Sequence, residues 1–194
     1  MPADHFPFGC DTEKYRVQPG SSRSGIAFYA RIGNARRGLE LGLLALQLFA
    51  QRQPDCDIHL CGERIEDLPF KRINHGLVSP AQLNEIYNCS FAGLSLSLTN
   101  VSLVPHEMLS AGCIPVVNEA EHNRIVLDNP HVRYAEPTPQ ALAAALEDIV
   151  TAANFADLSS RGAESVVSVS WYDASAAVES IFERTLRPQI PLHQ

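Results

Sequence analysis

The sequence lacks an apolar run long enough to cross a membrane. Its longest apolar stretches fall far short of the roughly 20 residues that a membrane-spanning helix needs. No N-terminal segment joins a basic start to an apolar run, as a secretory signal does. We therefore expect the protein to be cytoplasmic.

The sequence also lacks a basic excess, paired cysteines and a histidine cluster. Its 15 lysines and arginines face 22 aspartates and glutamates, a formal net charge of −7, whereas a nucleic-acid-binding surface has to be basic. The five cysteines are scattered without a Cys-x-x-Cys pair, so we expect reduced thiols.

Asp55-Cys-Asp57 precedes a predicted strand instead of following one, which disfavours a site that binds a metal together with a nucleotide sugar. We expect no metal and no other cofactor.

The composition that remains is typical of a globular domain. Among 194 residues, 45% are hydrophobic and 19% are charged, enough for a sizeable core. The charge is unevenly spread, because the stretch from Lys14 to Leu39 holds six basic residues and no acidic one. This stretch is either a solvated loop with a helix start or a local anion site on an acidic body.

Short apolar runs alternate with helical patterns along the chain. The runs predict strands at 25–30, 57–61, 72–75, 91–98, 114–117 and 132–134. Helices are predicted at 34–53, 80–88, 102–111, 121–127, 138–168 (as one or two helices) and 171–186. This alternation predicts a doubly wound, Rossmann-like α/β domain over residues 25–186, with a mostly parallel sheet and a C-terminal helix. The Pro-, Gly- and Ser-rich residues 1–24 predict a linker, and residues 187–194 a tail.

Basic residues follow the first predicted strand, at the edge of the sheet where such folds bind ligands. Arg31 ends the strand, and Arg36-Arg37-Gly38 opens the next predicted helix. Free N–H groups and the helix dipole would meet the guanidiniums there, which predicts an anion site. We take Arg36 as a solvated residue of the helix face. The sequence has neither G-x-G-x-x-G nor a Walker motif, so neither a dinucleotide site nor a P-loop is supported.

A second polar turn follows the strand predicted at 91–98. Ser102 is expected to be the N-cap of the next helix, and Glu107 lies just beyond its first turn. That carboxylate either complements the helix dipole or accepts hydrogen bonds from the vicinal hydroxyls of a ribose.

An ordered set of short motifs then resembles a known family. The set comprises Phe6-Pro-Phe-Gly-Cys-Asp11, Phe28-Tyr-Ala-Arg31, Arg37-Gly38, His75-Gly76, the stretch from Ser97 to Gly112 and Ile114-Pro-Val-Val117. It resembles the C-terminal donor-binding domain of GT-B glycosyltransferases, in particular glycosyltransferase family 4 and related polysaccharide rhamnosyltransferases. The resemblance runs from residue 6 to about residue 186.

The resemblance implies roles for individual residues. Arg31 and Arg37 would bind the diphosphate of a nucleoside-diphosphate sugar, and Glu107 would hold the ribose. The resemblance also implies that the backbone of Asn100, Val101, Ser102 and Leu103 lies at the diphosphate and sugar. Gly76 and Leu77 would form a loop beside the nucleobase, and Ser97 and Thr99 would lie on the sugar side. Thr99 departs from the family pattern, which has glutamate eight residues before Glu107. No residue is assigned as catalytic.

The resemblance implies only half of an enzyme. A GT-B glycosyltransferase has an N-terminal domain of similar size that binds the acceptor, and that domain would be either missing from this chain or a separate subunit. We expect metal-independent transfer of a hexosyl or rhamnosyl group to a saccharide or lipid-linked acceptor, with any membrane contact through the missing half. The alternatives are a non-catalytic nucleotide-binding partner subunit and, less compatible with the missing glycine fingerprint, a sugar-nucleotide epimerase.

Overall fold

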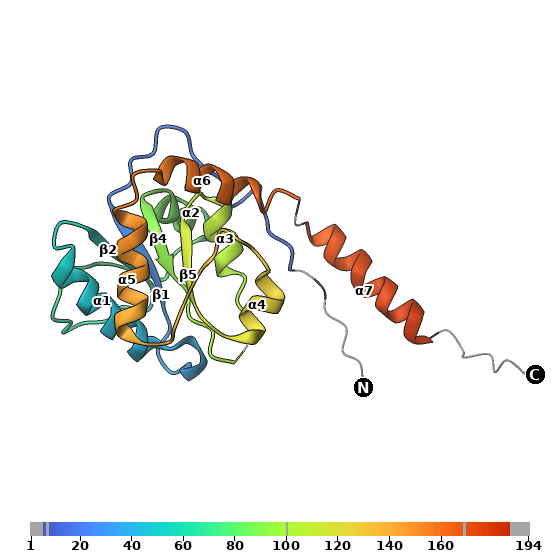
Figure 1. Ribbon diagram of the computed structural model, residues 1–194, viewed down its shortest axis with the longest axis horizontal. Helices are drawn as coiled ribbons and strands as arrows, with labels where there is room; N and C mark the ends of the chain where they lie inside the picture. The colour runs from blue at the N-terminus through green and yellow to red at the C-terminus, as the bar shows by residue number, and fades with distance from the viewer. Residues whose placement is uncertain (1–5, 7, 100, 169, 187–194) are drawn as a thin grey trace, which may run out of the picture.

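A six-stranded parallel sheet forms the centre of the molecule (Figure 1). The computed structural model describes residues 6, 8–99, 101–168 and 170–186. The strand order is β3-β2-β1-β4-β5-β6, and every neighbouring pair is parallel. The strands are β1 Gly25–Ala30, β2 Asp57–Gly62, β3 Ile73–Gly76, β4 Ser90–Leu94, β5 Ile114–Asn118 and β6 Arg133–Ala135. The predicted doubly wound α/β fold is confirmed.

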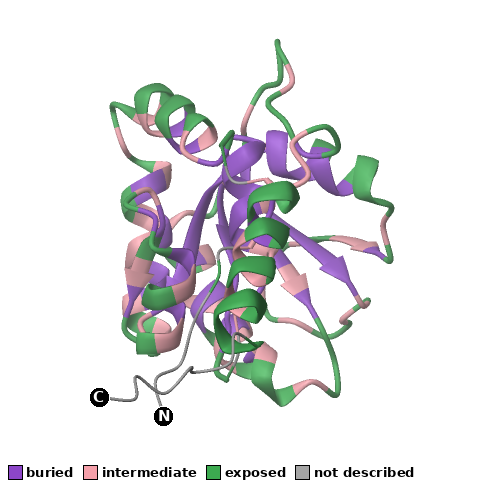
Figure 2. Ribbon diagram, turned by 90° about the vertical axis from the view of Figure 1, so that its right-hand side faces the viewer, coloured by how far each residue is buried: buried purple, intermediate pink, exposed green. Residues whose placement is uncertain are grey.

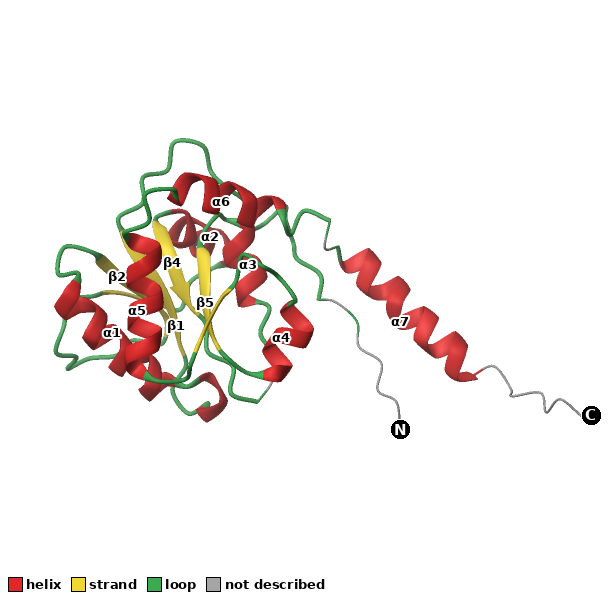
Figure 3. Cartoon of the chain, viewed as in Figure 1, coloured by secondary structure: helices red, strands yellow, loops and turns green. Residues whose placement is uncertain are grey.

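Helices cover both faces of the sheet (Figure 3). α1 and α5 pack together on one face, and α2 and α3 lie on the other. The helices are α1 Leu39–Arg52, α2 Pro80–Asn88, α3 Val104–Ser110, α4 Glu121–Leu127, α5 Pro139–Val150, α6 Phe155–Glu164 and α7 Trp171–Leu186. The pattern at 138–168 thus forms two helices, and the C-terminal helix is present.

Alternation along β1 divides its side chains between two buried layers. Ile26, Phe28 and Ala30 join the cluster under α1 and α5, whereas Ala27 joins the cluster under α2 and α3. Figure 2 shows the strands buried between the layers of helices. Both faces are dry because the sheet is parallel and covered on each side.

Two predicted element boundaries are wrong near the ends of β1 and β4. The helix predicted from residue 34 begins at Leu39, because a 3-10 turn, η1 Ala35–Arg37, ends at Gly38 with a φ of 57°, which favours glycine. The strand predicted to residue 98 ends at Leu94. Beyond it, the Ser97 N–H and carbonyl bond to the Asn118 side chain in place of a neighbouring strand.

The segment predicted as a linker has no helix or strand among its described residues, but it packs on the domain. Tyr15 is buried, and its carbonyl accepts a hydrogen bond from the Ser110 hydroxyl. The Arg16 N–H donates to Asn84 Oδ1 at 3.0 Å. Arg23 donates to the carbonyls of Tyr87, Ser90 and Ala111. These bonds tie the segment to α2 and α3.

α7 extends away from the rest of the domain (Figure 1). Of its residues that the structure describes, only Ala174 is buried. None of the described helices has both the length and the apolar character that are required to span a bilayer.

Candidate functional site

A cavity of about 540 Å³ lies where the connections of the sheet reverse direction. After β3 the chain crosses back to place β4 on the other side of β1, and ligands of open α/β sheets bind at such a reversal, beyond the carboxyl ends of the strands. The cavity is lined by one residue of the N-terminal segment, by one residue of β1, by residues that follow β1, β3 and β4, and by residues near the starts of α2 and α3. They are Tyr15, Tyr29, Arg31, Asn34, Arg36, Arg37, Val78, Pro80, Leu83, Ser95, Leu96, Ser102, Leu103, Val104 and Glu107.

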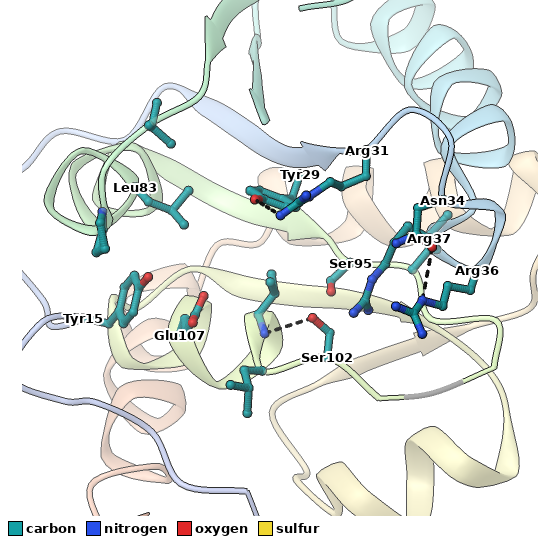
Figure 4. A pocket seen from close by; sticks show the side chains of 15 residues that line it. Tyr15, Tyr29, Arg31, Asn34, Arg36, Arg37, Leu83, Ser95, Ser102 and Glu107 are labelled. Atoms are coloured by element: carbon teal, nitrogen blue, oxygen red, sulfur yellow. Dashed lines mark hydrogen bonds between the residues drawn. The ribbon is translucent and has the colours of Figure 1, made fainter. Parts of the chain in front are cut away.

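Three arginines gather on one side of this cavity (Figure 4). Arg31 lies over the Tyr29 ring, with its guanidinium carbon 5.4 Å from the ring centroid, and donates to the Tyr29 hydroxyl at 3.1 Å. Within the described part of the chain, no carboxylate lies within 4.0 Å of Arg31, Arg36 or Arg37. The charge of the three guanidiniums is therefore available to an anionic ligand.

The side chain of Arg37 is held in place by Ser97, a buried residue that does not line the cavity. Its Nη1 donates to Ser97 Oγ at 3.2 Å. Asn118 accepts from the Ser97 N–H at 2.8 Å and donates to its carbonyl at 3.1 Å, and that carbonyl also contacts His122 Nε2 at 2.9 Å. The buried Ser97 is thus rigidly placed and orients Arg37. Burial, and then the charges of Arg36 and Arg31, lower the pKa of Arg37.

Glu107 lies on the other side of the cavity, near Tyr15 and Leu83 (Figure 4). Its carboxylate has no hydrogen-bond or ion-pair partner among the described residues. Burial raises the pKa of Glu107 to about 7, because an apolar setting disfavours the charged form. The carboxyl group therefore has unused acceptor capacity, which a ligand rich in hydroxyl groups could fill.

The structure brings five of the predicted site residues to this one cavity. Arg31, Arg37, Ser102, Leu103 and Glu107 line it. Ser97 contacts Arg37 without lining the cavity.

The other predicted residues do not line the cavity. Gly76 is buried at the end of β3, Leu77 is 85% exposed and Thr99 is exposed. Val101 precedes the lining residue Ser102. Asn100 lies outside the described residues. From the predicted nucleobase loop, it is the next residue, Val78, that reaches the cavity.

Ser102 is not the N-cap that the sequence predicts. α3 begins at Val104 with Leu103 as its N-cap, and Ser102 Oγ accepts from the Val104 N–H at 3.3 Å. Pro105 falls inside the first turn of the helix. The hydroxyl of Ser102 therefore stabilises the loop before the helix and lines the cavity.

Several residues that line the cavity carry no signal for it in the sequence. Arg36 is exposed, as expected. It belongs to the 3-10 turn and not to α1, however, and its side chain lines the cavity. Tyr15 comes from the segment predicted as a linker. No local signal marks Tyr15, since its place depends on packing against Tyr87, whose ring centroid is 6.3 Å away.

No group of three histidine, cysteine, aspartate or glutamate side chains that could hold a metal ion occurs in the part of the chain that the structure describes. The five cysteines are free thiols.

A family model described as "WsaF, C-terminal domain" matches residues 24–147, which include β1 to β6 and the residues that line the cavity from Tyr29 onward. The chain belongs to the WsaF C-terminal domain family. The O-antigen biosynthesis protein RfbC of Myxococcus xanthus is 32% identical over 164 residues, which are 80% of this chain. The chain spans only 13% of the length of that relative.

Solved structures share the fold of this WsaF-type domain. Sucrose-phosphate synthase from Thermosynechococcus elongatus superposes with a TM-score of 0.74 at 15% identity, over 93% of this chain and 52% of that one. The C-terminal domain of a group 1 glycosyl transferase (LpcC) from Francisella tularensis gives 0.60 at 15% identity, over 90% and 98%. The pneumococcal O-GlcNAc transferase GtfA, solved with UDP and GlcNAc, gives 0.66 at 12% identity, over 90% and 38%. The chain is a glycosyltransferase-type domain with the fold of a GT-B half.

Proposed function

We propose that this domain binds the nucleoside-diphosphate sugar donor of a glycosyltransferase that assembles a bacterial polysaccharide. One observation carries the proposal. A single cavity at the β1–β4 reversal has guanidiniums on one side and the Glu107 carboxyl on the other, and none of these groups forms an ion pair with another described residue. A nucleoside diphosphate has the matching order of groups, because its phosphates are anionic and its ribose offers vicinal hydroxyls. Two similar proteins, the O-antigen biosynthesis protein RfbC and the O-GlcNAc transferase GtfA solved with UDP, agree with this class of chemistry.

In this proposal Arg31 and Arg37 bind the two phosphates, and Glu107 accepts hydrogen bonds from the ribose. The charge on the phosphates grows as the sugar leaves, and positioned guanidiniums stabilise such charge without a metal. Ser102, Leu103, Val101 and Asn100 would form the backbone segment at the diphosphate and sugar, with Ser97 and Thr99 on the sugar side. Gly76 and Leu77 would belong to the loop beside the nucleobase, and the next residue, Val78, would contact the base because it lines the cavity.

The acceptor would be a saccharide or a lipid-linked saccharide, bound by a second domain. The length of RfbC leaves ample chain for such a domain. The reaction would transfer a hexosyl or rhamnosyl group, and no residue of this chain is proposed as the catalytic base. A non-catalytic nucleotide-binding subunit would use the same cavity.

Calorimetry tests the binding role directly. Uridine, thymidine, guanosine and adenosine diphosphates, and their hexose esters, are titrated into the chain without added metal. We expect at least one base to bind, and Arg31→Ala or Arg37→Ala to weaken that binding at least tenfold, since a charge-assisted hydrogen bond contributes about 1.5–3 kcal/mol. The matched control is Arg161→Ala, because Arg161 lies on α6 and pairs with Asp157. Failure of every ligand to bind, or equal affinity in all four proteins, would contradict the proposal.

Donor hydrolysis and transfer by the chain alone separate half an enzyme from a whole one. We expect the 194-residue chain to bind the donor without turnover, because in this proposal a second domain binds the acceptor. Steady release of nucleoside diphosphate by the isolated chain would overturn the view that a second domain is needed.

A further inference from the structure

Arg36 is a third guanidinium that the diphosphate role above leaves unused. Its Nε donates to Asn34 Oδ1 at 3.2 Å, and its carbonyl accepts from the Leu98 N–H at 2.9 Å. These two bonds fix the turn and the side chain together. Its terminal nitrogens have no partner among the described residues, and Figure 4 shows the side chain beside Arg37. The guanidinium is thus positioned but unsatisfied.

Like charges gather here without compensation. No carboxylate of the described chain lies within 4.0 Å of the three guanidiniums. The charges of Arg36 and Arg31 contribute to the lowered pKa of Arg37, after burial, so the cations repel one another in the free protein. A ligand relieves this repulsion in proportion to the negative charge that it brings to this side of the cavity.

The charge of the proposed ligand changes during the reaction. A nucleoside-diphosphate sugar carries two negative charges on its phosphates. Transfer breaks the bond between C1 of the sugar and the β-phosphate oxygen, and the electron pair stays on that oxygen. The acceptor hydroxyl forms the new bond to C1 and loses its proton to water. The departing nucleoside diphosphate therefore carries about three negative charges above the second pKa of its terminal phosphate, about 6.

The position of Arg36 matches the atom that gains this charge. Figure 4 shows Arg36 on the side of the cavity away from Glu107. A ribose held at Glu107 directs the phosphates toward the arginines, with the β-phosphate farther along than the α-phosphate.

We infer that Arg36 is the cation that balances the third charge, the one that appears on the β-phosphate as the sugar leaves. This inference rests on the proposed function. Arg31 and Arg37 bind the two phosphates before and after the sugar leaves, and Arg36 adds the third guanidinium, which matches the charge that the leaving group gains. Arg36 thus favours the product-like charge distribution over the donor, which is the condition for an interaction to accelerate the chemical step.

The test compares two ligands that differ in this charge. Calorimetry at about pH 8, where the terminal phosphate is ionised, measures the Kd of the best-bound nucleoside diphosphate and of its hexose ester. The proteins are the unmodified chain, Arg36→Ala, Arg36→Lys and the control Arg161→Ala. We expect Arg36→Ala to weaken nucleoside diphosphate about tenfold and the hexose ester less than about threefold. Arg36→Lys should restore most of the difference, and Arg161→Ala should change neither value.

Each other outcome is decisive. Equal weakening of both ligands by Arg36→Ala, or no weakening of either, would overturn the inference while leaving the proposed function in place. Absence of binding by either ligand to the unmodified chain would overturn both. Circular dichroism of the variants identifies any loss of fold, and Asn34→Ala then provides a second test. That substitution removes the acceptor that orients Arg36, and it should also reduce the preference for the free diphosphate.

Discussion

At the scale of single residues, the surroundings of Glu107 change the pKa of its carboxyl group. Burial raises its pKa from 4.5 to about 7, so the folded protein holds a proton there that the unfolded chain releases. Stability should therefore fall as pH rises from about 4.5 to about 7. Glu107→Gln removes this dependence and should stabilise the chain by about 2 kcal/mol at about pH 8, while changing little at about pH 4.5.

Urea unfolding at the two pH values checks this prediction. Glu85→Gln is the matched control, since Glu85 is an exposed residue of α2 that lines no part of the cavity. A stabilisation by Glu107→Gln that is the same at both pH values would contradict a raised pKa. The expected gain in stability should come with weaker ligand binding, because the amide offers one acceptor where the carboxylate offers two.

The sequence identifies site residues when the local pattern places them just after a strand. Arg31 and Arg37 follow β1 closely, and Glu107 lies near the start of α3, so the parallel topology brings them together. The local sequence pattern does not identify Tyr15 or Leu83, because these residues reach the cavity through contacts between distant segments. The sequence predicts a helix at Arg36, and a helix would place this side chain on a solvated face instead of in the cavity.

At the scale of elements, the contact between α1 and β1 depends on a glycine. A Cβ atom at Gly42 would lie 2.4 Å from Cζ of Phe28, a ring that is 1% exposed and has no room to move. We expect Gly42→Ala to destabilise the chain by roughly 1–3 kcal/mol through overpacking, although alanine gains about 1 kcal/mol in helix propensity.

Chemical denaturation tests that expectation against a second position on α1. Leu44 is 53% exposed, so Leu44→Ala should change stability by less than about 1 kcal/mol. A more stable Gly42→Ala protein would mean that helix propensity outweighs the close packing of α1 on β1.

Element boundaries were predictable where cap residues mark them, and the predictions failed where backbone conformation or a distant hydrogen-bond partner sets the boundary. α2 occupies the predicted residues, since Pro80 and the capping box of Ser79 and Gln82 define its start. The helix predicted from residue 34 starts late because Gly38 adopts a positive φ. The apolar pattern continues past the end of β4, but the hydrogen bonds of Ser97 go to the Asn118 side chain. Periodicity carries no information about such a partner.

At the scale of the whole molecule, the acidic chain concentrates uncompensated positive charge at the reversal point of its sheet. The net charge of −7 is unfavourable for binding nucleic acids, which need a basic surface. Three arginines that have no acidic partner among the described residues nevertheless face one cavity. The order of strands and helices was sufficient to predict this edge of the sheet as the binding edge. The packing of residues 8–24 was not predictable, because it rests on long-range bonds such as that from Arg16 to Asn84.

The central claim is that a nucleoside diphosphate lies between the ends of β1 and β4. An NMR titration of the ¹⁵N-labelled chain with the best-bound nucleoside diphosphate tests it most directly. We predict that the largest amide and arginine Nε shifts fall at residues 31–38 and 101–107, and that the shifts saturate with the calorimetric Kd. The largest shifts at α6 and α7 instead, or shifts that never saturate, would contradict the claim.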